Sequence, residues 1–456
     1  MKKTCYFLLI FLFAGTYFVV GQTITATGGD KPVYVERGIE ITKIDSIFLF
    51  YGMTDAKLTY TSPTPSSLIT WKKYKYQDNQ IVITNLSGNQ TENVSVLTDI
   101  QPDYGYIVID EKIDEENVYA DTMIVWVTDY TQYISDARKL NVIEDDDKCN
   151  SVILQANIPD IFYYSFAHGT KEKLTRTYEI MYETLKWNES RKQYDVEKQT
   201  ITATNVYSDE NTVRLRVNAP LADTNFTMKE KRYAGDAFGY DYSTISDTYT
   251  AVQVDVHAYA SVTGRKGSGN EITPPDSTFG TFSVSASAPV IVDFVGYASD
   301  AARHFSWEFS SRDDFSVLTA TYPQQDLSFT FDRTGTYYVR LNVSDLFNNC
   351  SAVSDLFVIN VHESFIEAPN YFTPGSTAGR NAEFKVSYKS IRKFKCSIYN
   401  RWGGFVYEYT DPALGWDGTI NGKLVPPGVY FYVIEAEGSD GIKHKLKGDI
   451  NLIYSK

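Results

Sequence analysis

Residues that commonly carry catalysis or bind metals are scarce in this sequence. Its 456 residues include four cysteines and five histidines, and the histidines are scattered rather than placed at metal-ligand spacings. The sequence has no nucleophile elbow, zinc-binding HExxH, Walker loop, dinucleotide fingerprint or CxxC pair. We therefore expect no catalytic residue, no cofactor and no metal ion, and we interpret the protein as a non-enzyme.

Positive charge is also in short supply. The chain has 43 Lys and Arg against 57 Asp and Glu, which gives a formal net charge of −14. Binding to nucleic-acid phosphates needs clustered Lys and Arg, so this balance excludes a nucleic-acid partner. The last segment differs, because residues 363–456 hold 12 Lys and Arg against 10 Asp and Glu. This difference in charge predicts that the C-terminal segment is a separate module.

Apolar runs long enough to span a membrane are absent after the N-terminus. At the N-terminus, two lysines precede an apolar stretch that begins at Tyr6. Val19 and Gly21 then stand at the −3 and −1 positions of a cleavage site. Residues 1–21 are therefore predicted to be a signal peptide, with an uncleaved membrane anchor as the alternative.

Cleavage there would leave three cysteines, Cys149, Cys350 and Cys396. An odd number allows at most one intramolecular disulfide among them. We interpret all three as isolated, small buried residues. The alternative is a Cys149–Cys350 bridge that ties two domains together, and the spacing of the cysteines does not exclude it.

Hydrophobic residues alternate with polar ones at period two along much of the chain. Val213, Leu215 and Val217 alternate with arginines, and similar alternation recurs at 252–257 and 337–343. This period is typical of half-buried β-strands. Short strands separated by turn residues predict an all-β protein of tandem immunoglobulin-like β-sandwich domains. The segment 171–187 fits a helix or a hairpin equally well.

Composition divides the rest of the chain into four predicted domains. Residues 23–134 are predicted to form an immunoglobulin-like β-sandwich, and residues 135–284 a second β-rich domain. Residues 285–362 and 363–456 are predicted to form the third and fourth domains. The stretch 264–280, rich in Gly and Pro, is interpreted as a long loop or linker.

The third predicted domain carries two aromatic stretches, at 305–309 and 329–345. Phe305, Trp307 and Phe309 lie on one face of a strand, where they would fill a core. The two stretches resemble a PKD domain, an immunoglobulin-like sandwich of bacterial surface proteins. The sequence departs from that family after the tryptophan strand, where Ser-Ser-Arg replaces the usual Gly-Asp-Gly turn.

The fourth predicted domain carries a dense series of motifs in a fixed order. Together they resemble the gliding-motility-associated C-terminal domain, also described as the type B sorting domain of type IX secretion in Bacteroidetes. The motif residues, to which the resemblance assigns a structural or recognition role, are Asn370, Phe372, Pro374, Asn400, Arg401, Trp402, Gly403, Gly415, Trp416, Asp417, Gly418, Pro427, Gly428, Tyr430, Lys447 and Gly448.

We interpret these motif residues mainly as packing residues. Trp402 and Trp416 each adjoin a glycine, and both are expected to pack against strands. An acidic loop usually follows the Thr-Pro of this family, and residues 375–381 replace it here without a carboxylate. If that loop binds a cation in relatives, this chain has lost the ligands for it.

The resemblance implies export in two steps, first to the periplasm by the signal peptide and then outward through the outer-membrane secretion machinery. That machinery is the expected partner, and the expected location is secreted or on the outer cell surface. We expect an adhesion, binding or structural surface protein whose ligand is a host or cell-surface glycan or protein. Two alternatives are an exported polysaccharide-acting hydrolase with a site in 135–284, and a structural component of the envelope or gliding machinery.

Overall fold

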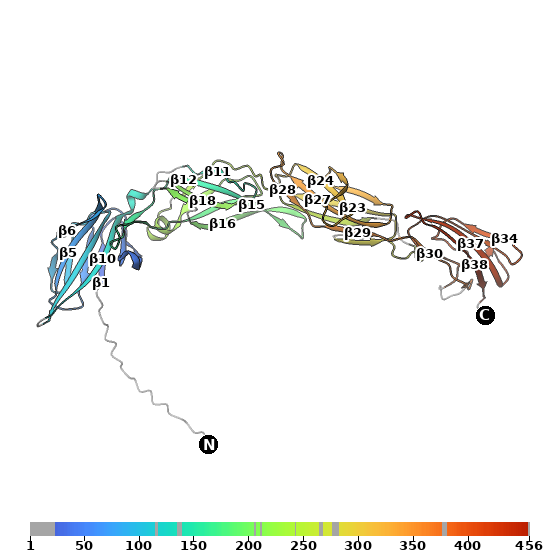
Figure 1. The fold of residues 1–456 in the computed structure, drawn as a ribbon, viewed down its shortest axis with the longest axis horizontal. Helices are drawn as coiled ribbons and strands as arrows, with labels where there is room; N and C mark the ends of the chain where they lie inside the picture. Colours follow the sequence, from blue (N-terminus) through green and yellow to red (C-terminus); the bar gives the residue numbers. More distant parts are fainter. Residues whose placement is uncertain are drawn as a thin grey trace, which may run out of the picture.

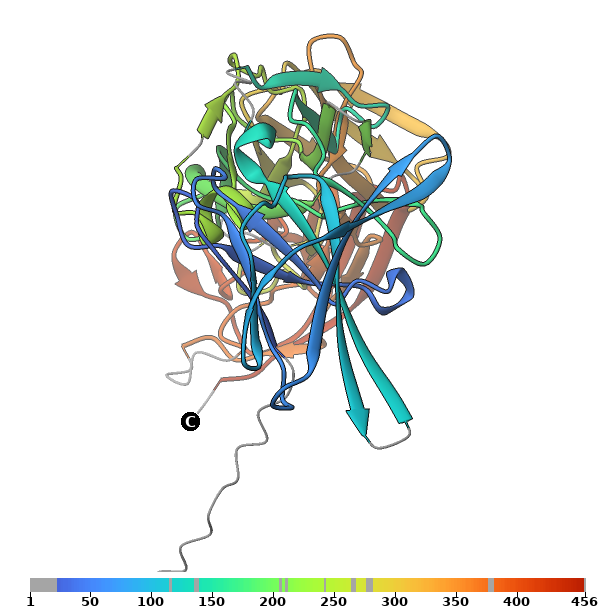
Figure 2. The same ribbon diagram turned by 90° about the vertical axis from the view of Figure 1, so that its left-hand side faces the viewer.

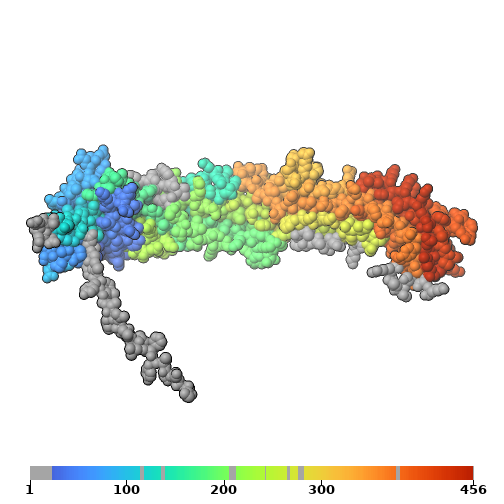
Figure 3. Space-filling view, turned by 60° about the horizontal axis from the view of Figure 1, so that its bottom comes forward, coloured from blue at the N-terminus to red at the C-terminus, as the bar shows by residue number. Residues whose placement is uncertain are grey.

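The structure, a computed structural model, describes residues 23–114, 117–134, 139–204, 207–209, 212–241, 243–263, 268–275, 282–375 and 381–454. The predicted signal peptide, residues 1–21, lies outside the described residues. The strands form four β-rich units that follow one another in a long, gently curved row (Figures 1 and 3). The prediction of tandem β-sandwiches is confirmed. Among the described residues, no helix has the length and apolar character needed to cross a membrane.

The first unit contains β1 (Thr23–Thr27), β2 (Tyr34–Arg37), η1 (Glu40–Thr42), β3 (Ser46–Phe50), β4 (Lys57–Thr61), β5 (Leu68–Gln77), β6 (Gln80–Leu86), β7 (Asn89–Thr91), β8 (Val94–Leu97), β9 (Tyr104–Asp114), β10 (Asn117–Asp129) and η2 (Tyr130–Tyr133). The sheet β1-β4-β8-β7 packs on the sheet β2-β3-β10-β9-β5-β6. The long β9–β10 hairpin extends beyond the rest of the unit (Figure 2). Trp71 and Tyr74 lie on opposite faces of the larger sheet, and both side chains are buried.

The second unit contains β11 (Asn141–Glu144), β12 (Ser151–Ala156), β13 (Phe162–Tyr164), β14 (Lys171–Lys173), β15 (Thr177–Asn188), β16 (Gln193–Thr204), β17 (Tyr207–Asp209), β18 (Thr212–Asn218), β19 (Thr227–Glu230), the π-helix η3 (Lys231–Ala237) and β20 (Ser243–Ile245). Its main sheets are β11-β12-β18-β17 and β16-β15-β19-β20. Val213, Leu215 and Val217 all point into the core between them, as period two predicts. The segment 171–187 is not helical, because it forms β14 and most of β15.

The third unit contains β21 (Val256–Thr263), β22 (Ser283–Ala286), β23 (Val290–Ala298), β24 (His304–Ser310), β25 (Leu318–Tyr322), β26 (Leu327–Phe331), β27 (Gly335–Ser344), β28 (Ser351–Val353) and β29 (Phe357–Val361). Trp307 and Phe309 are buried in its core, with Phe305 packed against them. β21 lies inside the range predicted for the second domain, yet it pairs with β23 along its whole length. This sandwich therefore takes up residues well before 285.

The fourth unit contains β30 (Phe365–Glu367), β31 (Tyr371–Phe372), β32 (Ser387–Lys389), β33 (Ile391–Tyr399), β34 (Phe405–Tyr409), β35 (Thr419–Ile420), β36 (Lys423–Leu424), β37 (Gly428–Gly438) and β38 (Lys443–Leu452). Its main sheet has the order β31-β38-β37-β33-β34. One face of this sheet packs against residues of β30, β32 and the segment around Trp416.

The first and second units share a hydrophobic core. Leu49 and Trp126 of the larger sheet of the first unit pack together with Tyr163, Tyr233 and Phe238 of the second. That sheet is therefore covered on both faces, by its own partner sheet and by the next unit. A shared core of this kind makes the two units one rigid segment of the row.

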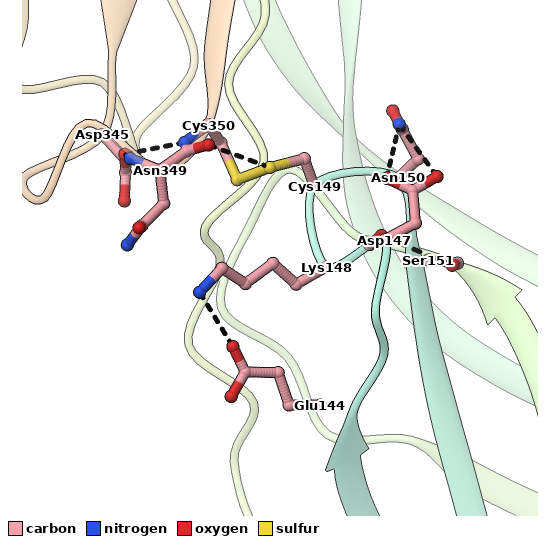
Figure 4. Close-up of a disulfide and its surroundings, with 9 residues drawn as sticks. All are labelled: Glu144, Asp147, Lys148, Cys149, Asn150, Ser151, Asp345, Asn349 and Cys350. Carbon is pink, nitrogen blue, oxygen red and sulfur yellow. Dashed lines mark hydrogen bonds and ion pairs between the residues drawn. A yellow bond between two sulfur atoms is a disulfide. The ribbon is translucent and has the colours of Figure 1, made fainter.

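A disulfide between Cys149 and Cys350 joins the second and third units (Figure 4). Cys149 lies in the loop between β11 and β12, and Cys350 lies just before β28. Our interpretation of isolated cysteines is therefore wrong for these two, because the end-to-end stacking of sandwiches brings two distant loops together. Cys396, in the fourth unit, is free and buried.

Candidate recognition surface on the C-terminal domain

Most of the motif residues gather at the end of the fourth unit that points away from the third. β33 starts next to Ser390, which contacts the third unit, and ends beside the Asn400–Gly403 turn. β37 starts at this far end and β38 finishes there, since Gly428 pairs with Leu452. In Figure 1 the C-terminus also lies at this end. We call the surface formed by the Asn400–Gly403 turn and the start of β37 the tip.

Trp416 forms the centre of the packing behind the tip. Its side chain is fully buried, and its ring centroid lies 5.3 Å from that of Phe372 and 5.2 Å from that of Tyr430. The indole Nε1–H donates to the carbonyl oxygen of Thr419 at 2.9 Å, so this buried donor is paired. Trp416 is therefore a packing residue, as its sequence context predicts.

The residues after Trp416 make a tight turn against this packing. Gly418 has a φ of +80°, and a Cβ atom there would lie 2.6 Å from Cγ of Pro374. Asp417 Oδ1 accepts hydrogen bonds from the backbone N–H of Thr419 at 2.9 Å and from its hydroxyl at 2.8 Å. The Asp-Gly pair therefore fixes the chain direction, and the carboxylate is used in doing so.

Asn400 fixes the second turn of the tip. Its Oδ1 accepts hydrogen bonds from the backbone N–H of Trp402 at 3.0 Å and of Gly404 at 2.9 Å. Its own N–H donates to the carbonyl oxygen of Gly404 at 2.8 Å. Gly403 supplies the positive φ, +81°, that the turn requires. Held in this way, the turn gives the side chains of Arg401 and Trp402 a defined direction.

Trp402 points out of the domain, which contradicts the prediction that it packs against strands. Its side chain is 76% exposed, and the Arg401 guanidinium lies over the ring at 4.1 Å from the ring centroid. The core behind it is already filled by Trp416 and neighbouring aromatic rings. Burial therefore does not explain why a tryptophan is held at this position.

Other apolar side chains are exposed on the strands next to the Asn400–Gly403 turn. Phe405 is 62% exposed and Phe431 is 44% exposed, and both lie opposite Tyr399 on neighbouring strands. A groove of about 330 Å³ lies beside the indole, lined by Arg401, Ile420, Val425, Pro426, Pro427 and Val429. An exposed apolar groove of this kind makes the tip a candidate interaction site.

Charged side chains on the same sheet lie closer to the third unit and pair with one another. Lys395 contacts Glu408 at 3.0 Å, and Lys393 contacts Glu437 at 2.9 Å. The hydrogen bond from Lys395 lowers the pKa of Glu408 below its usual value. These four charges are thus matched within the domain, and the tip offers mainly apolar contacts beside Arg401.

The remaining motif residues lie around these two turns or along β38. The Asn370 carbonyl oxygen accepts a backbone N–H from β38 at 2.9 Å, and Gly415 lies against the segment that leads into β32. Gly448 lies beneath the Tyr432 ring, while Lys447 is exposed on the outer face. Among the described residues, no group of three or more His, Cys, Asp or Glu is placed to hold a metal ion.

The sequence reasoning missed Phe405, Phe431 and Ile420 as surface residues of the tip. A signal was available in β37, where the run from Val429 to Ile434 is apolar without interruption. A strand that is apolar on both faces must either be covered twice or expose one apolar face. Here it exposes one.

Comparison with known families identifies two parts of the chain. Residues 366–452 match the CHU_C Type IX secretion signal domain, and residues 141–246 match the fibronectin type III domain Fn3_FA. A comparison with curated proteins found no match. The C-terminal domain is therefore a type IX secretion signal domain, as the motifs predict, and it directs the protein to the cell surface or out of the cell.

Solved structures that are similar to this chain have low identity. Latent PorU from Porphyromonas gingivalis is 12% identical, with 70% of this chain and 32% of that chain covered, at a TM-score of 0.16. The chicken CNTN1 FN1–FN3 domains are 10% identical over 69% of this chain and 98% of that chain, at 0.23. The four N-terminal Ig domains of Dscam1 isoform 8.4 are 12% identical over 93% and 100%, at 0.22. Similarity at this level identifies no function.

Proposed function

We propose that this protein is a non-catalytic adhesion or structural protein of the outer cell surface. Type IX secretion machinery recognises it at the tip of its C-terminal domain. A signal peptide that ends before Gln22 would bring the chain to the periplasm first. The partner of the exported rod would be a glycan or a protein on a host or neighbouring cell. We also propose that the third unit is a PKD-like β-sandwich.

One observation carries the recognition part of the proposal. Trp402 belongs to the family-like motif, packs into no core, and has its backbone held by the Asn400 side chain. A fixed and exposed tryptophan beside an apolar groove has the character of an interface hot spot. Trp416, from the same motif set, accounts for the fold of the domain. Replacing Trp402 therefore tests recognition, whereas replacing Trp416 tests folding.

The adhesion or structural role is supported by the architecture. Fibronectin type III and secretion signal domains are non-catalytic kinds of domain. The match at 141–246 covers most of the region in which a hydrolase site was the alternative. A stiff row of sandwiches also places its two ends far apart (Figure 1), which suits a protein that presents one end away from the cell.

The test compares two full-length variants with the unaltered protein by surface proteolysis of intact cells. Trp402→Ala should fold normally and reach the surface at one tenth or less of the normal level. Lys423→Ala removes another exposed side chain near the tip and should be exported normally. Purified Trp402→Ala should melt at the temperature of the unaltered protein. Normal export of Trp402→Ala would rule out the tip as the recognised surface.

A further inference from the structure

The segment Ser268–Pro275 crosses from the third unit to the C-terminal domain and pairs with it. Glu271 forms a parallel β-bridge with Tyr388 of β32. The Ile272 N–H donates to the Tyr388 carbonyl oxygen at 2.7 Å, and the Tyr388 N–H donates to the Asn270 carbonyl oxygen at 3.2 Å. Part of the stretch interpreted from sequence as a linker therefore adds a β-bridge to β32 of the neighbouring domain.

Side chains of this segment strengthen the contact. Asn270 Nδ2 donates to the carbonyl oxygens of Val386, at 2.7 Å, and Pro412, at 2.8 Å. Val386 lies just before β32, and Pro412 lies between β34 and β35. The hydroxyl of Ser268 lies 3.1 Å from that of Tyr388. A single asparagine thus joins two separate segments of the C-terminal domain to the third unit.

Two buried serines hold the same interface from the other side. The Ser390 N–H donates to Ser287 Oγ at 2.7 Å, and the Ala288 N–H donates to Ser390 Oγ at 3.1 Å. The Ser390 hydroxyl donates to the carbonyl oxygen of His362 at 2.6 Å. Both serine side chains are fully buried, so losing the Ser287 hydroxyl would remove the acceptor of the Ser390 N–H inside the interface.

The chain joint between the two domains, His362–Pro369, is itself paired. The His362 N–H donates to the Ala286 carbonyl oxygen at 3.0 Å, and the Ser364 N–H donates to Asp440 Oδ2 at 2.8 Å. β30, inside the joint, pairs with β32. These hydrogen bonds oppose the local opening that a protease needs in order to cut the joint.

We propose that Ser268–Pro275 is a clasp that seats the secretion signal domain on the third sandwich, so that the machinery receives residues 256–454 as one unit. The inference rests on the proposed function, since it concerns the same tip. The clasp fixes the tip at the end opposite the third unit, where a flexible tether would let it fold back. It also protects the joint between the two domains.

The test uses the full-length protein with Asn270→Ala and Ser287→Ala combined. Asn85→Ala and Ser87→Ala, two exposed residues of the first unit, form the matched control. Limited proteolysis with mass analysis should leave the joint intact in the unaltered and control proteins. The clasp variant should be cut within His362–Pro369 at least tenfold faster, and its surface level should fall. If the double variant folds poorly, Asn270→Ala alone serves as the milder variant. Its joint should be cut faster than that of the unaltered protein and more slowly than that of the double variant.

The possible outcomes separate the two proposals. Cleavage of the unaltered joint as fast as that of the clasp variant would overturn the clasp. Fast cleavage of the variant together with normal export would overturn the claim that residues 256–454 act as one unit. Absence of the unaltered protein from the surface would instead contradict the proposed function, whatever the proteolysis of the joint shows.

Discussion

Cys149 and Cys350 are 201 residues apart in the sequence and are joined by a disulfide between two sandwiches. Asp345 Oδ1 accepts the Cys350 N–H at 3.0 Å, which orders the loop on the side of the third unit (Figure 4). On another side of the same junction, the Trp187 ring stacks on His257 at 4.4 Å. The junction is therefore held by a covalent and an aromatic contact, and the covalent one forms in an oxidising compartment.

The first prediction concerns the disulfide. Peptide mapping without reductant should recover Cys149 linked to Cys350, with Cys396 as a free thiol. Burial raises the pKa of Cys396 to about 12, so alkylation at neutral pH should spare it until the domain unfolds. Reduction should lower the unfolding free energy of the second and third units by about 2–4 kcal/mol and leave the fourth unchanged. Recovery of Cys149 and Cys350 as free thiols would contradict the structure.

Glu189 gives a prediction about pH. Its carboxylate accepts hydrogen bonds from Lys192, from the Tyr259 hydroxyl of the third unit, and from Trp187 Nε1 at 2.8 Å. The bond from Lys192 contributes most to lowering the pKa of Glu189, from 4.5 to about 2. Because this folded-state pKa is depressed, the stabilisation is complete above pH 4.5 and is lost as pH falls towards 2.

Thermal melting of the unaltered protein and of Glu189→Gln at a series of pH values checks this. The difference in melting temperature should be constant from pH 7 to about 5 and should shrink steadily below that. A difference that has already disappeared at pH 4.5 would show that the carboxylate is not held as described.

The buried pair Arg176–Glu230 supports the junction of the first and second units. Arg176 Nη1 donates to Glu230 Oε2 at 2.6 Å, and the Tyr130 hydroxyl of the first unit donates to the same oxygen at 2.7 Å. Glu230→Ala would leave a buried guanidinium without its counter-charge and should cost about 3–5 kcal/mol in denaturant unfolding. Glu197→Ala, which breaks the exposed contact to Lys186, should cost less than about 1 kcal/mol. Equal costs would contradict the assignment.

Trp416→Ala tests the packing behind the tip. The change removes a fully buried indole and should lower the unfolding free energy of the C-terminal domain by about 3–5 kcal/mol. Trp402→Ala, at an exposed position, should change it by less than about 0.5 kcal/mol. Calorimetry of the full-length proteins gives both values. Similar losses for the two variants would mean that Trp402 is also a core residue.

The sequence was sufficient for the strands, because alternation such as that of Val213, Leu215 and Val217 depends on local geometry alone. It was not sufficient to tell Trp402 from Trp416. Both adjoin glycine in a shared motif, and their opposite burial depends on hydrogen bonds that turn one side chain outward.

The contacts between domains were the least predictable features. The Cys149–Cys350 bridge and the pairing of Glu271 with Tyr388 depend on how whole sandwiches stack, and single residues carry no periodic signal for this. The same reason explains β21, whose strand pattern was clear although its partner sheet was not.

The central claim is that the C-terminal domain is the export address of this protein. The most direct measurement is surface proteolysis of intact cells that produce the chain with or without residues 363–456. The account predicts that the complete chain is digested from outside, whereas the shortened chain stays protected in the periplasm with its remaining sandwiches folded. Equal digestion of both chains on intact cells would contradict it.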